Sequence, residues 1–204
     1  KNYFTIVGTD GHRLAKFKHQ SEQTFENMPG VIIPKKTINE LSKILSENNE
    51  KIDINISSTK ILFKIGNIYL VSKLIDGNFP DYNRVIPNDN NKSLEVSRTT
   101  LLSAVDRVST IANDKSPVIK FKIEENSINL SSVNNDKSTA TEDINIKYSG
   151  DVVEIGFNSK YIMDILNNLE DETINLTFKD NSSPITASEK SNKELIYVLM
   201  PMRV

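Results

Sequence analysis

The stretch LEVSRTTLLSAVDRVSTIANDKSPVIKFKI, residues 94–123, contains the pattern that decides the fold. It begins as a short strand pattern and continues from Ser97 with apolar residues at helical spacing. It ends with the alternation of Ile119, Phe121 and Ile123. Ser is a common N-cap because its side chain accepts hydrogen bonds from the first helical turn, and alternation with a period of two is typical of a half-buried strand. The stretch therefore predicts strand, helix and strand in succession.

The same pattern occurs about three times along the chain. Thr37, Ser97 and Asn158 are N-cap residue types that stand about 60 residues apart, and each precedes an apolar helical pattern. Glu40 follows Thr37 at the spacing of a capping box. Each set of apolar residues lies on one helical face; the sets are Ile38, Leu41, Ile44 and Leu45; Leu101, Val105, Val108 and Ala112; and Ile162, Ile165, Leu166 and Leu169.

A strand pattern precedes each predicted helix, and strand patterns follow it, so the repeated unit is predicted to be β-α-β-β-β. One unit cannot cover both its apolar helix face and its apolar sheet face, whereas two paired units can. The fold class is therefore α+β. We expect a partial domain at residues 1–79 and a complete domain of two paired units at residues 80–204.

Composition narrows the class of protein. Hydrophobic residues make up 37% of the chain, charged residues make up 25%, and the net charge is −2. No apolar run approaches the roughly 20 residues of a membrane-spanning helix, and no basic and then apolar leader occurs. We therefore expect a cytoplasmic protein without a membrane partner. The absence of cysteine excludes disulfides and thiolate chemistry.

Candidates for catalysis are few. The only histidines are His12 and His19, and Asp10 beside His12 is the one pair that suggests acid–base or metal chemistry. However, Asp10-Gly11 between two alternating strands is a strong hairpin signal. No glycine-rich phosphate-binding motif and no HExxH motif occurs. We expect a non-catalytic protein with no metal and no cofactor.

Three segments in this order resemble the bacterial DNA sliding clamp, the beta subunit of DNA polymerase III: TDGHRLA at 9–15, FPDY at 79–82 and MPMR at 200–203. The resemblance implies clamp domains built from repeated α+β units, with helices inside and sheets outside. The chain begins on a strand pattern without an initiator Met. We therefore expect a C-terminal fragment that holds part of the second domain and the whole third domain.

The resemblance also implies a function. Members of this family encircle double-stranded DNA as processivity factors and tether the DNA polymerase III catalytic subunit. The clamp loader and repair proteins with a clamp-binding motif are the other implied partners, and the full-length protein would form a homodimeric ring. A stand-alone peptide-binding adaptor of repeated α+β units, without DNA binding, is the alternative.

A groove for an apolar peptide needs adaptable walls, and methionine suits that role. The resemblance assigns the groove to Thr9, Gly11, His12, Arg13, Leu14, Pro80, Arg84, Val85, Val198, Met200, Pro201, Met202 and Arg203, and more weakly to Pro184. From the residues alone, another interpretation stays open. Met200 and Met202 would then be ordinary core, with Pro201 ending a strand.

Two other sites follow from the resemblance. Lys35 and Lys36 match a basic pair that faces duplex phosphates, and they precede a predicted helix start, where free N–H groups favour an anion. Arg107, Thr110 and Ile111 match a subunit interface. The stretch 134–143 carries less acidic charge than the matching patch in the family, which implies a weaker or differently built contact.

Overall fold

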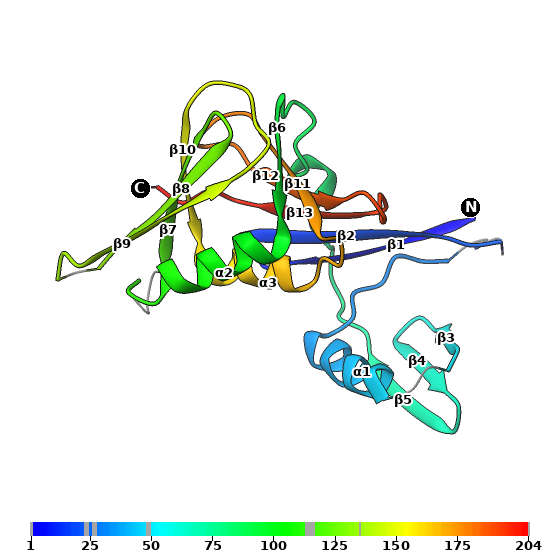
Figure 1. The fold of residues 1–204 in the computed structure, drawn as a ribbon. Coiled ribbons are helices and arrows are strands. Elements are labelled where there is room, and N and C mark those ends of the chain that lie inside the picture. The colour runs from blue at the N-terminus through cyan, green and yellow to red at the C-terminus, as the bar shows by residue number, and fades with distance from the viewer. Residues whose placement is uncertain are drawn as a thin grey trace. The chain divides into compact units, whose positions relative to one another are not determined.

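The computed structural model describes residues 2–22, 25, 28–47, 50–112, 117–134 and 136–203 (Figure 1). The chain forms two compact units, one of residues Phe25–Asp81 and the other of Lys1–Thr24 together with Tyr82–Val204. The smaller unit contains α1 (Lys35–Glu47), β3 (Ile52–Ile56), β4 (Lys60–Ile65) and β5 (Ile68–Lys73). The larger unit contains β1 (Tyr3–Thr9), β2 (Arg13–Gln20), the 3-10 helix η1 (Tyr82–Arg84), β6 (Lys92–Ser97), α2 (Arg98–Ser109), β7 (Val118–Glu124), β8 (Ser127–Val133), β9 (Thr139–Asn145), β10 (Val153–Asn158), α3 (Ser159–Asn167), β11 (Thr173–Phe178), β12 (Ile185–Glu189) and β13 (Leu195–Leu199).

Two of the predicted β-α-β-β-β units make up most of the larger unit, as β6-α2-β7-β8-β9 and β10-α3-β11-β12-β13. The strand order of one sheet is β10-β7-β8-β9, and that of the other is β1-β2-β13-β12-β11-β6. Each copy therefore gives its first strand to the sheet of the other copy. The repeat was predicted correctly from the sequence, but this exchange was not.

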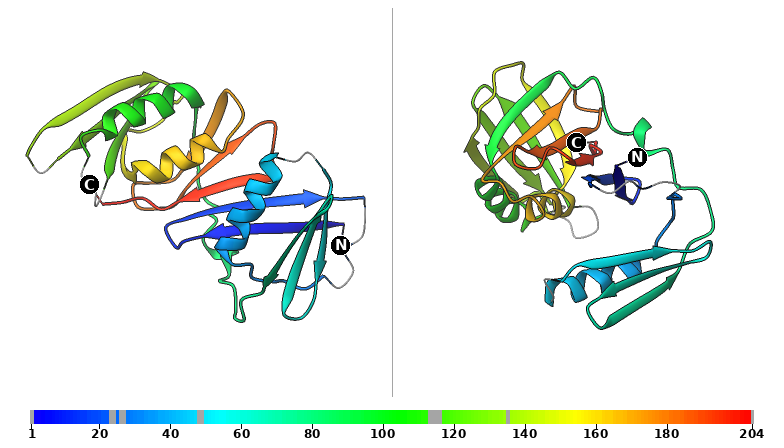
Figure 2. Two further views of the ribbon diagram at one scale, coloured as in Figure 1. Left: turned by 90° about the horizontal axis from the view of Figure 1, so that it is seen from below. Right: turned by 90° about the vertical axis from the view of Figure 1, so that its right-hand side faces the viewer.

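The core of the larger unit lies between the two helices and the two sheets. Helices α2 and α3 lie side by side (Figure 2, left). Leu101 and Val105 of α2 and Leu166 of α3 are buried in one cluster with Phe121 and Phe157 from the strands. Full burial of each such side chain contributes about 1.5–3 kcal/mol. The predicted apolar faces of these two helices are therefore confirmed within the helices. Ala112 lies beyond the end of α2 and outside the cluster, whereas Leu169 lies beyond the end of α3 but is buried in it.

The helix starts bear out two of the three predicted N-caps. The Ser97 side chain accepts a hydrogen bond from the Thr100 N–H at 3.3 Å. The Asn158 Oδ1 atom accepts from the N–H groups of Lys160 at 3.0 Å and Tyr161 at 3.4 Å. Both helices thus begin where a side chain satisfies otherwise free backbone donors.

The predicted N-cap at Thr37 is wrong. Helix α1 begins at Lys35, so Lys35 and Lys36 are its first residues instead of preceding it. Thr37 lies buried in the first turn; its N–H donates to the Pro34 carbonyl at 2.9 Å, and its hydroxyl lies 2.7 Å from that of Ser72. The capping box with Glu40 is also wrong, because this carboxylate pairs with Lys43. Pro34 directly precedes the helix, and a proline at this place is a sequence signal for a helix start. The prediction from apolar periodicity did not take it into account.

The hairpin of β1 and β2 extends the six-stranded sheet of the larger unit. Strand β2 pairs antiparallel with β13, with Leu14 opposite Val198. The predicted turn at Asp10-Gly11 is confirmed, and Gly11 has φ +86°, which glycine adopts without the penalty of a Cβ atom. The second and the last strands of the chain, β2 and β13, thus lie next to each other in one sheet.

The smaller unit contains the third copy of the pattern. Strands β3, β4 and β5 form an antiparallel sheet in chain order, and a single bridge joins Ile32 to Ile75. Thr37 is the only buried residue of α1, whereas Ile38 and Leu45 on its predicted apolar face are 43% and 37% exposed. Among the described residues, no helix is long and apolar enough to cross a membrane.

Candidate functional site

The tip of the β1–β2 hairpin is organised by the Asp10 carboxylate. Its Oδ1 atom accepts hydrogen bonds from the N–H groups of His12 and Arg13, both at 3.0 Å, and its Oδ2 atom accepts from Arg13 Nε at 3.1 Å. The Thr9 hydroxyl donates to the Arg13 carbonyl at 2.8 Å and accepts from the Gly11 N–H at 3.2 Å. Partial burial alone would raise the pKa of Asp10, but these hydrogen bonds hold it below its usual value.

Arg13 also connects the hairpin tip to α3. Its Nη1 atom donates to Asp164 Oδ2 at 2.6 Å, and its guanidinium carbon lies 4.3 Å from the centre of the Tyr161 ring. The His12 ring stacks on Tyr161, with 6.3 Å between ring centres and an interplanar angle of 25°. Desolvation would lower the pKa of Arg13, but the two carboxylates raise it. Arg13 therefore stays charged between two acids and an aromatic ring.

Two backbone hydrogen bonds hold the segment that follows β13. The Met200 N–H donates to the His12 carbonyl at 2.9 Å, and the Met202 N–H donates to the Gly156 carbonyl of β10 at 2.8 Å. Met200 is 38% exposed, Pro201 and Met202 are half-buried, and Arg203 is exposed. Neither methionine belongs to the buried core cluster. Both methionines therefore lie outside the buried core, next to the hairpin tip and β10, and their role in a groove stays a prediction.

Leu14 and Val198 are buried on the face of the sheet opposite the helices. Tyr197 and Leu199, which flank Val198 in β13, pack in the core beneath the helices. Leu14 and Val198 are also buried but do not belong to that core cluster. Because side chains alternate along a strand, the two residues point to the other face. Another part of the chain must therefore cover them.

The segment of residues 82–90 crosses this outer face. Near its start, the Lys16 ammonium lies 5.8 Å from the centre of the Tyr82 ring. At its end, Asn90 Nδ2 donates to the carbonyls of Thr177 and Pro184, both at 3.1 Å. Arg84 and the exposed Val85 lie between these two anchors.

One surface of the larger unit thus contains most of the predicted groove. We call it the groove surface and define it as the hairpin tip, the segment 82–90 and the tail 200–203, together with Leu14, Pro184 and Val198. It includes Thr9, Gly11, His12, Arg13, Leu14, Arg84, Val85, Pro184, Val198, Met200, Pro201, Met202 and Arg203. Pro80 lies in the smaller unit. Its predicted role stays a prediction.

Contacts within the groove surface add residues that the sequence did not single out. Tyr161 and Asp164 of α3 hold Arg13, Asp10 shapes the tip, and Gly156 anchors the tail. In the sequence, Tyr161 and Asp164 stand between the apolar residues of the predicted helix. At these positions they would be interpreted only as residues of its solvent-exposed side. Asp10 was recognised as a turn residue, and nothing in the sequence indicates its ion pair.

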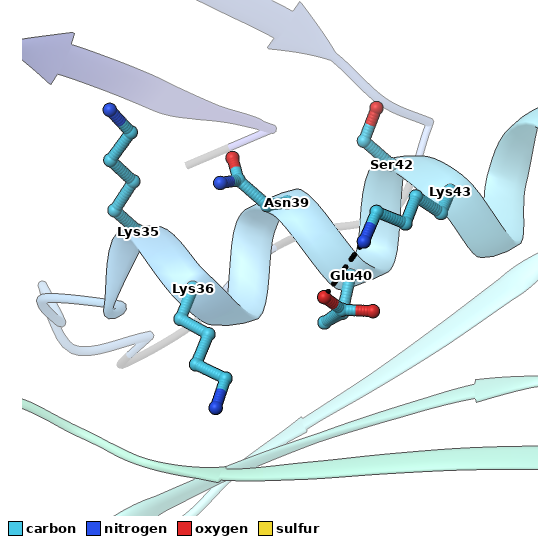
Figure 3. A pocket seen from close by; sticks show the side chains of 6 residues that line it. All are labelled: Lys35, Lys36, Asn39, Glu40, Ser42 and Lys43. Atoms are coloured by element: carbon cyan, nitrogen blue, oxygen red, sulfur yellow. Dashed lines mark hydrogen bonds and ion pairs between the residues drawn. The ribbon is translucent and has the colours of Figure 1, made fainter.

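Lys35 and Lys36 lie in the first turn of α1 and line a shallow hollow of about 540 Å³ (Figure 3). Their side chains point in different directions from the helix. The remaining lining residues are Asn39, Glu40, Ser42 and Lys43, with Lys43 Nζ 3.0 Å from a Glu40 carboxylate oxygen. Within the described part of the chain, neither Lys35 nor Lys36 forms an ion pair. Cations at a helix N-terminus oppose its dipole, so an anion there would be favourable.

The third predicted site lies at the end of α2. Arg107 makes a two-pronged ion pair with Glu142 of β9, with Nε and Nη2 at 2.9 Å and 2.5 Å from its oxygens. The hydrogen bond from Arg107 lowers the pKa of Glu142. The Thr110 hydroxyl donates to the Arg107 carbonyl at 2.8 Å, and Ile111 is half-buried. Two donor groups of the Arg107 guanidinium, Nε and Nη2, are thus occupied by Glu142.

No group of three or more His, Cys, Asp or Glu residues in the described ranges is arranged to hold a metal ion.

The comparison with known families decides the class of protein. The family model for the C-terminal domain of the DNA polymerase III beta subunit matches residues 83–203, and the model for its central domain matches residues 1–81. The chain belongs to the DNA polymerase III beta subunit family. The resemblance of the three segments and the clamp fold are thereby confirmed.

Individual members of the beta subunit family are similar over nearly all of this chain. The Beta sliding clamp of Caulobacter vibrioides is 39% identical over 97% of the chain and 53% of the relative. Sliding clamps of Bartonella birtlesii and Pseudomonas aeruginosa, each bound to griselimycin, are 42% and 32% identical with TM-scores of 0.95 and 0.94. They are matched over 99% and 100% of this chain and 55% of each relative. The chain thus spans about half the length of these relatives.

Proposed function

We propose that this chain is the part of a sliding clamp that carries the peptide-binding groove. The whole protein would encircle double-stranded DNA as a processivity factor and tether the replicative DNA polymerase. The observation that carries this proposal is the groove surface, where the tail with the exposed Met200 is hydrogen-bonded to the hairpin tip. The griselimycin-bound relatives support a ligand site on this fold.

The chemistry of the groove surface indicates an apolar peptide with a polar anchor. Met200 and Met202 would provide adaptable apolar contacts, and Arg203, which follows Met202, together with Arg84 of the segment 82–90 would provide charged donors. A peptide in which Gln is followed after two residues by Leu and Phe would fit this class. Burial of one Leu and one Phe contributes about 1.5–3 kcal/mol each, less the entropy of ordering the peptide. Binding should be no tighter than the micromolar range, about −8 kcal/mol at best.

Duplex DNA is the second proposed ligand, and Lys35 and Lys36 are the proposed contacts. Two exposed lysines at a helix N-terminus can attract phosphates without reading bases. A ring that slides needs only such loose contacts. The affinity of this interaction should fall as the salt concentration rises.

The remaining assignments follow from the same proposal. Arg107, Thr110 and Ile111 would meet another subunit when the ring forms, as a homodimer of the whole protein. The DNA polymerase III catalytic subunit, the clamp loader and repair proteins with a clamp-binding motif would share the groove. The protein would be non-catalytic, without a cofactor, and would act in the cytoplasm.

The groove is tested with Met202→Asp and with deletion of residues 200–204. We expect both variants to lose binding of a fluorescent Gln-containing Leu-Phe peptide in an anisotropy titration, because a charge in a desolvated pocket is costly. Met28→Asp is the matched control, since Met28 is an exposed methionine of the smaller unit. Unchanged affinity in the folded deletion variant would refute the groove.

A stand-alone peptide-binding adaptor remains the second candidate on the basis of the groove alone. Membership of the beta subunit family favours the clamp instead. Retention of the whole protein on circular duplex DNA, and its loss on linearisation, would separate the two. Peptide binding without retention on either DNA would favour the adaptor.

A further inference from the structure

We propose that Asp164 is a positioning residue for the groove surface. Through Arg13, the Asp164 carboxylate fixes the hairpin tip against α3, and the tip in turn fixes the position of the Met200 backbone. The binding consequence of this inference rests on the proposed peptide-binding function. The positional consequence does not.

A short chain of contacts connects Asp164 to the tail. Asp164 Oδ2 accepts from Arg13 Nη1 at 2.6 Å, and Arg13 Nε donates to Asp10 Oδ2 at 3.1 Å. Asp10 also accepts from the His12 N–H at 3.0 Å, and the His12 carbonyl accepts from the Met200 N–H at 2.9 Å. Two of these contacts lie within the tip, and the other two join the tip to α3 and to the tail, so the three segments are connected in series.

The hairpin tip needs such a connection because it extends beyond the sheet. The pairing of β2 with β13 ends at Arg13 opposite Leu199, so Asp10, Gly11 and His12 lie outside the ladder. The contacts within the tip fix its local shape, so its direction depends on the hydrogen bond between His12 and Met200 and on the contacts with α3. Asp164 and Tyr161 both belong to α3. The Arg13–Asp164 ion pair and the contacts with the Tyr161 ring therefore orient the tip relative to this helix.

Exposure indicates that Asp164 contributes to position more than to stability. The Asp164 side chain is 59% exposed and that of Arg13 is 31% exposed. Exposed ion pairs contribute little to the free energy of folding. Arg13, however, donates to two carboxylates and lies over a ring, so its planar group has a single orientation that satisfies all three. Removal of Asp164 leaves the Arg13 side chain with the Asp10 carboxylate of its own turn and with the Tyr161 ring as its remaining contact with α3.

The loss of this orientation should weaken peptide binding. A peptide that contacts His12 and Met200 would have to order the tip on binding, and that entropy reduces the affinity. We expect Asp164→Asn to weaken binding of the Gln-containing Leu-Phe peptide about three- to tenfold, in the lower part of the range of coupling between contacting residues. The melting temperature should stay the same within error.

The experiment is a double-mutant cycle with Asp164→Asn, Arg13→Gln and the double variant. Peptide affinity is measured by anisotropy, and hydrogen exchange at the Met200 amide is measured without peptide. Glu124→Gln is the matched control, because Glu124 forms a 2.6 Å ion pair with Lys122 at similar exposure outside the groove surface. Asp164→Glu keeps the charge and should recover much of the affinity.

The expected result is faster Met200 exchange in Asp164→Asn, wild-type exchange in Glu124→Gln, and a double variant no weaker than Arg13→Gln alone. Wild-type affinity and exchange in Asp164→Asn would overturn the inference. So would a double variant whose loss equals the product of the two single losses. If the wild type does not bind the peptide, the proposed function fails, and the Met200 exchange alone then decides whether Asp164 positions the tail.

Discussion

The smaller unit and the larger unit contain the same β-α-β-β-β pattern, yet their helices differ in burial. In the larger unit, two copies pair, and α2 and α3 bury Leu101 and Leu166 in a common core. In the smaller unit, a single copy leaves Ile38 of α1 exposed. The comparison shows that an apolar helical face is a property of the sequence, whereas its burial requires a second copy to pack against.

The largest expected difference concerns the cores of these helices. Leu101→Ala should lower the free energy of unfolding of the larger unit by about 2–5 kcal/mol, because Leu101 is fully buried. Ile38→Ala should change that of the smaller unit by less than about 1 kcal/mol. Urea denaturation followed by circular dichroism measures both. Equal losses would mean that α1 is packed as α2 is.

The next largest effect distinguishes a cap from a buried hydroxyl at Thr37. Aspartate is at least as good an N-cap as threonine, so Thr37→Asp would be neutral or stabilising if Thr37 were a cap. Because Thr37 is buried against Ser72, we expect a loss of about 1–3 kcal/mol instead. Asn158→Asp is the control at a true cap and should stay near the wild-type value in thermal denaturation.

A smaller effect concerns the hairpin tip and its dependence on pH. The pKa of Asp10 is lower in the folded protein than its usual value of 3.8. The carboxylate therefore stabilises the tip above pH 3.8, and this contribution is lost as the pH falls through the lower folded value. Amide exchange at His12 should increase over that acidic range. Asp10→Asn should show no such step at His12, and an unchanged step in that variant would contradict the assignment.

The smallest expected effect on stability comes from charge reversal at Lys35 and Lys36. This change should stabilise the helix but weaken DNA binding. Lys35→Glu with Lys36→Glu should stabilise α1 by about 0.3–1 kcal/mol, because acids suit a helix N-terminus. The same change should reduce retention of the whole protein on DNA at low salt, and the deficit should shrink at high salt.

Lys60→Glu with Lys73→Glu is the matched control for this charge change. These two lysines face each other on β4 and β5 of the same unit, so the variant has the same net charge without altering α1. Equal retention of the two double variants would mean that total charge matters and that Lys35 and Lys36 have no special role.

Local patterns predicted the repeats, the caps at Ser97 and Asn158, and the Asp10-Gly11 turn, because each depends on residues near one another in the chain. The exchange of first strands between the two copies could not be predicted in this way. Either pairing satisfies the alternation of Leu94 and Val96 equally well, and only the tertiary fold selects one. The N-cap prediction at Thr37 was wrong because it relied on threonine being a common N-cap residue. The position of Pro34, which indicates a helix start at Lys35, was not considered.

The groove residues were proposed from a resemblance, since methionine and proline near a terminus have no single meaning in isolation. What the sequence lacked was the set of partners. Arg13 was expected as a polar rim residue, but its ion pair with Asp164 connects residues 151 positions apart. No periodicity or spacing indicates such a pair. Contacts of this kind become visible only when the sheet brings β2 beside β13.

The adjacency of β2 and β13 has a consequence for biosynthesis. Leu14 must wait for Val198 before the six-stranded sheet is complete. At about 5–20 residues per second, the ribosome needs roughly ten seconds or more to make the intervening chain. During that time the hairpin has an unpaired edge, which can pair with other nascent chains. The four-stranded sheet closes earlier, at β10, whereas the exposed edge of the hairpin is covered only when β13 has been made.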